Sequence, residues 1–219
     1  AGSGANNIGV EISDTAQVLS RYVDIIMARV YGHSDIEELA QFSTVPVING
    51  LSDLHHPCQV LADLQTVRER FGDLRGRHLA YIGDGNNMAH SLLLGCARSG
   101  MSVSVATARG YECDAAIVAR AREHAAHFGQ VVRTTYSPAE AVSGVDAVYT
   151  DVWASMGQEE EHAKRVVAFA GCQVDAALMA HAKPDAIFLH CLPAHRGEEV
   201  SAEVCDGPQS AIFDEAENL

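Results

Sequence analysis

Residues 78–87 read HLAYIGDGNN, an apolar run that leads through a glycine-rich turn into polar residues suited to the start of a helix. Further apolar segments lie at 103–107, 131–135, 146–150 and 186–190. Stretches of helical periodicity separate them, near 87–98, 114–128, 138–143, 159–170 and 175–182. Regular alternation of this kind is typical of βα units around a parallel sheet. We therefore predict an α/β fold in which residues 72–219 form a doubly wound parallel sheet.

The first part of the chain, residues 1–71, shows the same alternation with fewer elements. The pattern predicts a helix begun by Ser13 and Asp14, a strand at 25–30, a helix from a capping box of Ser34 and Glu37 to Phe42, a strand at 45–48 closed by Asn49-Gly50, and a helix from Pro57 to Gly72. Two strands with one intervening helix cannot bury both faces of a parallel sheet. Residues 1–71 are therefore predicted to be part of a second α/β domain.

Both ends of the chain differ from typical domain ends. Residues 1–7 resemble a linker, and the last residues follow a strand-like run from Ala211 to Phe213, where a closing helix is expected but not found in the pattern. We expect a chain that is truncated at both ends.

The composition excludes several classes of protein. With 29 acidic and 15 basic residues among 219, the formal net charge is −14, which argues against a general nucleic-acid binder. No stretch approaches the roughly 20 apolar residues of a membrane span, and the N-terminus lacks the pattern of a signal peptide. We predict a cytoplasmic protein with reduced cysteines, because the six cysteines form no CxxC pair.

No residue is predicted to bind a metal. His124 and His127 lie three residues apart on a predicted helix, but neither cysteines nor a carboxylate cluster accompany them in the sequence. A pair of surface histidines is the favoured interpretation.

Polar clusters follow three of the predicted strands. They are Gly83–Asn87, Asp151–Gly157 and His190–Pro193. Because ligands of an open parallel sheet bind beyond the carboxyl ends of its strands, near the switch in strand order, these clusters are expected to form one pocket.

The pair Gly83 and Gly85 raises the alternative of dinucleotide binding. That fingerprint requires a third glycine, where this chain has Met88, and an acidic residue at the end of the next strand, where residues 106–109 contain none. A nicotinamide-dependent oxidoreductase is therefore disfavoured. A serine hydrolase is also disfavoured, because no GxSxG turn follows any strand.

Several of these polar residues also have structural interpretations. Asn86 and Asn87 either cap a helix or bind a carboxylate and an ammonium together. Asp151 either caps a helix or anchors a substrate ammonium, with Ser155 near a carboxylate. Cys191 is either a small buried side chain or a thiol beside an amine that must lose a proton.

A fourth cluster, His55–Gln59, stands at the start of the helix that Pro57 begins. One helical turn brings His56 and Gln59 together beside backbone N–H groups, a position suited to an anion or a polarised carbonyl. A simple N-terminal cap is the alternative.

Together, these clusters resemble the ornithine carbamoyltransferase family in their order along the chain and in their amino-acid sequence. The resemblance runs from about Gly9 to Asn218. The matching segments are Met27–Tyr31, His56–Gln59, Gly83–Asn87, Asp151–Gly157, His190–Pro193 and Phe213–Asn218. The DxWxSMG and HCLP elements point to ornithine as acceptor, since aspartate-specific relatives lack the SMG loop.

The resemblance implies transfer of the carbamoyl group of carbamoyl phosphate to the δ-amine of L-ornithine, giving L-citrulline and phosphate. Carbamoyl phosphate would be held by Arg29, His56 and Gln59, with Arg29 and His56 directed at the carbonyl oxygen. The amino-acid end of ornithine would be held by Asn87, Asp151, Ser155 and Met156. Cys191 and Leu192 would line the δ-amine, and the Leu192-Pro193 bond would be cis.

This chemistry relies on positioning and electrostatics. Negative charge that develops on the carbonyl oxygen can be stabilised by Arg29 and His56, and phosphate or a group near Cys191 can take the amine proton. No metal or organic cofactor is required. The resemblance also implies homotrimers or multiples of trimers. In this reading, residues 1–71 belong to a carbamoyl-phosphate-binding domain and residues 72–219 to an ornithine-binding domain.

Two departures from the family pattern affect the phosphate end. The family's Ser-x-Arg-Thr-Arg segment is absent, and its arginine after the Glu-Asn pair would fall at Leu219. The expectation is weak binding of carbamoyl phosphate and little turnover by this polypeptide. A non-catalytic amino-acid-binding or structural fragment of the family is the alternative.

Overall fold

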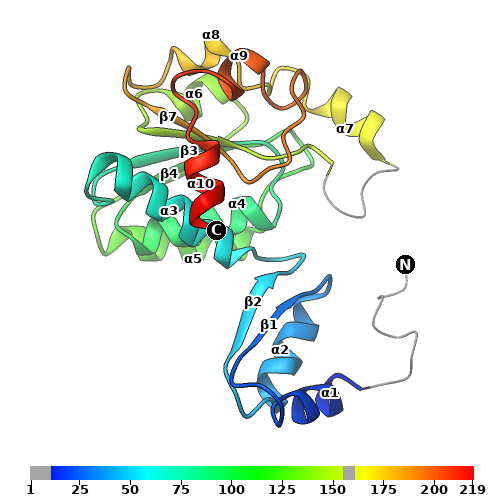
Figure 1. Ribbon diagram of the computed structural model, residues 1–219. Coiled ribbons are helices and arrows are strands. Elements are labelled where there is room, and N and C mark those ends of the chain that lie inside the picture. The colour runs from blue at the N-terminus through cyan, green and yellow to red at the C-terminus, as the bar shows by residue number, and fades with distance from the viewer. Residues whose placement is uncertain (1–10, 155–160) are drawn as a thin grey trace. The chain divides into compact units, whose positions relative to one another are not determined.

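The computed structural model describes residues 11–154 and 161–219, which form two compact units. The first unit is Ala1–Cys58 and the second is Gln59–Leu219. We describe each unit by itself (Figure 1). None of the helices in the described ranges is long and apolar enough to cross a membrane.

The first unit is a two-stranded parallel sheet with two helices (Figure 1). Its elements are α1 (Ile12–Leu19), β1 (Ile26–Arg29), α2 (His33–Phe42), β2 (Val47–Leu51) and the first residues of α3 (Pro57–Phe71). Strand β1 pairs with β2 from Ile26 opposite Val47 to Arg29 opposite Leu51. The small core consists of Ala16, Ile26, Ile36 and Leu39. The predicted order of elements is confirmed, but several of their ends differ.

Both predicted helix caps in this unit were wrong. Helix α1 starts after Glu11, and α2 starts after Gly32, so that Ser34 lies inside the helix. Neither start has a capping side chain of its own. The backbone N–H of His33 is satisfied by the distant Asp53 carboxylate at 2.9 Å, which replaces the local capping box.

Strand β2 also extends beyond its predicted end at Asn49-Gly50. The Asn-Gly pair lies inside the strand, because β2 pairs in parallel with β1 and needs no hairpin turn there. A side chain at Gly50 would lie 2.8 Å from the Met27 sulfur and 3.1 Å from the Ala28 carbonyl oxygen. Glycine therefore permits close approach of the strands beside the bulge at Ala28 and Arg29.

The second unit is a five-stranded parallel sheet in the order β5-β4-β3-β6-β7. Its strands are β3 (His78–Ile82), β4 (Ser102–Ala106), β5 (Val132–Thr135), β6 (Ala147–Thr150) and β7 (Ile187–His190). Its helices, besides most of α3, are α4 (Asn87–Arg98), α5 (Ala115–Ala126), α6 (Pro138–Val142), α7 (His162–Ala168), α8 (Ala176–Met179), α9 (Ala202–Cys205) and α10 (Ile212–Asn218). The predicted doubly wound α/β sheet is confirmed.

Alternate residues of β3 enter two separate cores. Leu79 and Tyr81 face a core that includes residues of α3, α4 and α5. Ala80 and Ile82 face a second core that includes residues of α6 and α8. Successive side chains of β3 thus point to opposite faces of the sheet, and helices cover both faces (Figure 1).

Helix α3 packs mainly with the second unit. Its residues Val60, Leu64 and Val67 are buried in the first of these cores, whereas Pro57 and Cys58 belong to the first unit. The boundary between the two compact units therefore lies within α3, between Cys58 and Gln59. The division at residues 71 and 72 stays a prediction about domains.

The strand predicted at Ala211–Phe213 was wrong. The chain makes one isolated parallel bridge, Ser210 opposite Phe188, and then forms α10. Ile212 and Glu215, one helical turn apart, are both buried. A buried charge on the inner face concealed the helical pattern in the sequence, and a short helix closes this end of the described chain.

Candidate active site

The loops after β3, β6 and β7 meet at Asp151. The Asp151 carboxylate accepts hydrogen bonds from the Asn86 amide at 3.0 Å, from the Cys191 thiol at 3.0 Å and from the Val152 backbone N–H at 2.8 Å. Strand order reverses between β3 and β6, so these loops surround the switch point of the sheet. The predicted convergence of the three polar clusters is confirmed.

Asn86 caps helix α4 and also forms a hydrogen bond with Asp151. Its side-chain oxygen accepts the N–H groups of Met88 and Ala89 at 3.0 and 3.2 Å, while its amide nitrogen donates to Asp151. Asn87 is the first residue of α4. The cap thereby fixes the start of α4 relative to Asp151, and the interpretation of Asn86 as a cap is confirmed.

The surroundings of Cys191 favour its protonated thiol. Burial raises the pKa of Cys191 well above its usual value, and the Asp151 carboxylate raises that pKa further. The same causes, with burial first, raise the pKa of the Tyr81 hydroxyl, which donates to Asn86 at 3.3 Å. The region therefore favours positive charge, such as a ligand ammonium, and disfavours a thiolate.

The Leu192-Pro193 peptide bond is cis, as predicted. The Leu192 backbone N–H donates to Nδ1 of His190 at 2.8 Å. His190 is fully buried at the end of β7, so the backbone of the HCLP segment is held against the sheet.

A buried network of carboxyl groups lies beside this segment. The Gln59 amide donates to Asp63 and to Glu215, at 2.9 Å in each case. Glu215 also accepts the Tyr149 hydroxyl at 3.1 Å and the His190 backbone N–H at 2.9 Å. Burial, and next the charge of Glu215, raises the pKa of Asp63 well above its usual value. Burial also raises the pKa of Glu215.

Asp63 and Glu215 were not among the site residues predicted from the sequence. A signal for Asp63 exists, because it falls between Val60 and Val67 on the apolar face of α3, where an acidic residue is out of place. For Glu215, the signals are its helical spacing from Ile212 and its place in the matching segment Phe213–Asn218.

The glycine at 85 has a structural explanation. A side chain at Gly85 would lie 2.3 Å from the backbone nitrogen of Cys113, and the Gly85 N–H donates to the Tyr111 carbonyl at 2.8 Å. Backbone from the segment after β4 occupies the space beside this turn. This contact accounts for Gly85 without a dinucleotide.

The first unit contributes Arg29 and His56. Arg29 ends β1 and is exposed; its backbone pairs opposite Leu51, but its side chain makes no hydrogen bond or ion pair with a residue in the described part of the chain. His56 is partly buried and directly precedes α3, after a turn in which the Ser52 N–H donates to the His55 carbonyl at 2.8 Å. Both therefore follow carboxyl ends of the parallel strands β1 and β2.

Comparison with known proteins identifies this arrangement. Residues 2–69 match the family model described as aspartate/ornithine carbamoyltransferase, carbamoyl-P binding domain. Residues 75–219 match the Asp/Orn binding domain of the same enzymes. The chain belongs to the aspartate/ornithine carbamoyltransferase family. It is thus a carbamoyltransferase by family, as the motifs predicted.

Curated members of this carbamoyltransferase family are similar over nearly the whole chain. An ornithine carbamoyltransferase of Symbiobacterium thermophilum is 61% identical over 210 residues, which are 96% of this chain and 68% of the relative. An enzyme of the same name from Bacillus subtilis is 54% identical, over 96% of this chain and 66% of the relative. The chain thus spans about two thirds of the length of these relatives.

Solved structures of the family agree with the fold. The ornithine carbamoyltransferase of Pyrococcus furiosus is 53% identical with a TM-score of 0.93, covering 97% of this chain and 68% of that chain. An acetylornithine transcarbamylase is 30% identical with a TM-score of 0.83, covering 97% of this chain and 72% of that chain.

The two family matches divide the predicted carbamoyltransferase site residues. Arg29, His56 and Gln59 lie in the part that matches the carbamoyl-P binding domain. The part that matches the Asp/Orn binding domain contains Asn87, Asp151, Ser155, Met156, Cys191 and Leu192. Among these, Ser155 and Met156 lie outside the described residues.

Proposed function

We propose that this chain forms the ornithine-binding part and some of the carbamoyl-phosphate-binding part of an ornithine carbamoyltransferase. The enzyme would transfer a carbamoyl group from carbamoyl phosphate to the δ-amine of L-ornithine, giving L-citrulline and phosphate. The observation that carries the proposal is the Asp151 carboxylate at the switch point, hydrogen-bonded by Asn86 and Cys191. The curated relatives that bear this name support it.

In this proposal, Asp151 and Asn87 hold the amino-acid end of ornithine, together with Ser155 and Met156. Asp151 is buried and lies beside groups whose pKa values are raised by burial and by its own charge. A bound α-ammonium would compensate that charge. Cys191 and Leu192 would then line the δ-amine.

The attacking δ-amine must be neutral, and its proton needs an acceptor. Burial and the Asp151 carboxylate hold the pKa of Cys191 far above its usual value, so the sulfur retains its own proton. A phosphate oxygen of the second substrate is therefore the better acceptor. Cys191 would position the amine and would not act as its base.

At the carbamoyl end, Arg29 and His56 would stabilise negative charge on the carbonyl oxygen. The amide nitrogen of Gln59 already donates to Asp63 and Glu215. Its carbonyl oxygen is therefore the group that can accept a hydrogen bond from the carbamoyl NH2. The buried carboxyls would fix Gln59 in that orientation.

Calorimetry with L-ornithine tests the acceptor site without requiring turnover. Asp151→Asn is expected to weaken binding at least about tenfold, because it removes the charge that pairs with the ammonium. Asp185→Asn, at an exposed aspartate, is the matched control and should leave the affinity unchanged. Equal affinity of the Asp151→Asn variant and the wild type would contradict the assignment.

A citrulline-forming assay on the same polypeptide tests catalysis separately. Citrulline formation supports the transferase. Ornithine binding that depends on Asp151, without citrulline formation, would favour the alternative of an amino-acid-binding fragment. A homotrimer, or a multiple of trimers, and a cytoplasmic location remain part of the proposal, and the mass in solution tests the first of these.

A further inference from the structure

A second group of histidine and carboxylate side chains lies after the HCLP segment. One ligand atom from each of His195, Glu198 and Glu199 lies within 4.8 Å of the others. Among residues 11–154 and 161–219, it is the one group of three or more histidine, cysteine or acidic side chains that are close enough together to hold a metal ion. None of its members is among the residues of the proposed ornithine site.

The Glu199 side chain has one satisfied and one unsatisfied oxygen. The residue is fully buried. Its Oε1 atom accepts hydrogen bonds from Nε2 of His190 at 3.2 Å and from the backbone N–H of His195. Its Oε2 atom is buried, accepts no hydrogen bond and lies 3.8 Å from Nδ1 of His195. A buried carboxylate oxygen therefore points into the group without a donor.

The hydrogen bonds of His190 show that it does not neutralise Glu199. The Leu192 N–H donates to Nδ1 of His190, so Nδ1 carries a lone pair and the ring proton is on Nε2. That proton is donated to Glu199. A neutral imidazole satisfies one oxygen and leaves Oε2 of the buried carboxylate without a donor.

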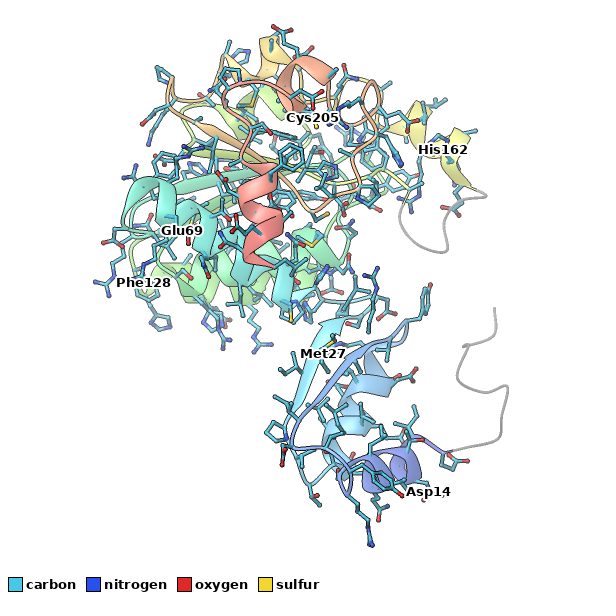
Figure 2. All side chains as sticks on the ribbon, viewed as in Figure 1. Asp14, Met27, Glu69, Phe128, His162 and Cys205 are labelled. Carbon is cyan, nitrogen blue, oxygen red and sulfur yellow. The ribbon has the colours of Figure 1, made fainter. Side chains whose placement is uncertain are left out.

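His162 lies outside the group of atoms within 4.8 Å of one another, but it contacts one member of that group. Its Nε2 atom lies 2.9 Å from Oε2 of Glu198. Figure 2 labels His162 on the ribbon of α7. The side chains of His162 and His195 are 45% and 49% exposed, so both can be reached by an ion from solvent.

We propose that His195, Glu198 and Glu199 bind a divalent transition-metal cation, best matched by zinc, with His162 as a further ligand. Imidazole and carboxylate ligands in a set of four suit zinc, whereas calcium and magnesium prefer six or more oxygens. Zinc bonds of about 2.0–2.2 Å separate tetrahedral ligands by about 3.3–3.6 Å. The 3.8 Å between Nδ1 of His195 and Oε2 of Glu199 requires a small contraction to reach this range.

The cation would connect the 195–199 turn to α7 and compensate the charge of Glu199. It has no part in the transfer chemistry proposed above. The inference therefore does not depend on the proposed function, and its test needs no turnover.

The test is a titration of the metal-free polypeptide with zinc chloride, in competition with a chromophoric chelator. One equivalent is expected to bind, and His195→Ala should weaken that binding at least about tenfold because it removes a ligand. His127→Ala and Glu203→Gln, at exposed positions outside the group, are matched controls that should leave the affinity unchanged. His195 is half exposed, so its variant should fold.

Cobalt(II) provides a second measurement on the same variants. Visible d–d absorption of tetrahedral intensity is expected for the wild type and should be lost in His195→Ala. Absence of zinc binding, or zinc binding that is unchanged by His195→Ala, would overturn the proposal. Loss of binding in Cys191→Ser alone would also overturn it, because the metal would then be held by the thiol.

Discussion

The two compact units differ in how firmly their side chains hold the candidate site residues. In the second unit, Asp151 accepts three hydrogen bonds and Gln59 donates two within a buried network. In the first unit, the side chain of Arg29 is exposed and makes no hydrogen bond or ion pair with any described residue. The acceptor end of the site is therefore prepared by the fold, while the described contacts of the first unit leave Arg29 unsupported.

The hydrophobic core of the second unit is also larger than that of the first. The second unit buries large side chains on both faces of its sheet, whereas the core of the first unit has four buried residues within its described part, 11–58. The first unit also exposes large apolar side chains, such as Tyr22 at 79%, Met27 at 66% and Tyr31 at 62%. Because stability depends on buried apolar area, the second unit should be the more stable of the two.

The largest expected effect is on the core of the second unit. Leu92→Ala removes a fully buried side chain from α4 and should destabilise this unit by about 3 kcal/mol, because it leaves a cavity. Trp153, the single tryptophan, lies in the second unit and stacks on Phe169, so its fluorescence during urea unfolding reports on that unit.

The matched variant is Leu39→Ala, in the core of the first unit. It should reduce the far-UV circular dichroism signal of the native state, yet leave the midpoint of the Trp153 transition unchanged. Equal shifts of that midpoint in both variants would show that the two units unfold together, and the comparison of their stabilities would then fail.

A smaller effect is expected at the buried acid pair. Burial and the neighbouring Glu215 raise the pKa of Asp63 in the folded state, so the folded protein binds a proton that the unfolded chain releases. The stability from that proton is fully present below the unfolded pKa of about 3.9 and is lost as the pH rises through the folded value. Asp63→Asn copies the protonated form and should stabilise the protein near neutral pH by about 1.5 kcal/mol.

Urea unfolding at several pH values checks this sign. The advantage of Asp63→Asn should shrink as the pH falls and be smallest below about 4, where the wild-type carboxyl is protonated in the unfolded state as well as in the folded state. Glu69→Gln, on the same helix but exposed, is the control. Hydrogen bonds with Asn218 and Gln65 lower the pKa of Glu69, so this variant should gain no stability near neutral pH. If the free energy of unfolding of Asp63→Asn exceeds that of the wild type by the same amount at every pH, Asp63 does not take up a proton on folding.

The regular part of the fold was predictable because its signals are local. The alternation of apolar strands and helices gave all five strands of the second unit to within one residue. The polar clusters after these strands predicted the meeting of Asn86, Asp151 and Cys191, because parallel strands bring their carboxyl ends to one edge.

The remaining errors arise where partners are distant in sequence. Asp53 replaces the local cap expected at Ser34, and Gly50 permits contact between parallel strands where a turn was expected. Glu215 and Asp63 lie far apart in the chain, and both make hydrogen bonds with Gln59. Charged residues in such a network interrupt the apolar pattern, so neither helix α10 nor the network was evident from periodicity.

The smallest effects concern helix starts, where the units again differ. In the second unit, α4 is capped by Asn86, whereas α1 and α2 in the first unit have no side-chain cap. Asn86→Ala should destabilise the second unit by about 1 kcal/mol, since two N–H groups of α4 lose their acceptor. The Trp153 transition in urea measures this change.

The converse change adds a cap to the first unit. Gly32 precedes α2 with φ −73° and ψ 127°, a backbone conformation that asparagine adopts readily. A side chain there would meet the Asp35 carboxylate at 3.4 Å, so the uncharged asparagine is a better choice than aspartate. Gly32→Asn should stabilise the first unit by a few tenths of a kcal/mol, which amide hydrogen exchange in α2 can detect. Slower exchange in α2 without any change in α4 would show that the units respond separately, while slower exchange in both would show that they are coupled.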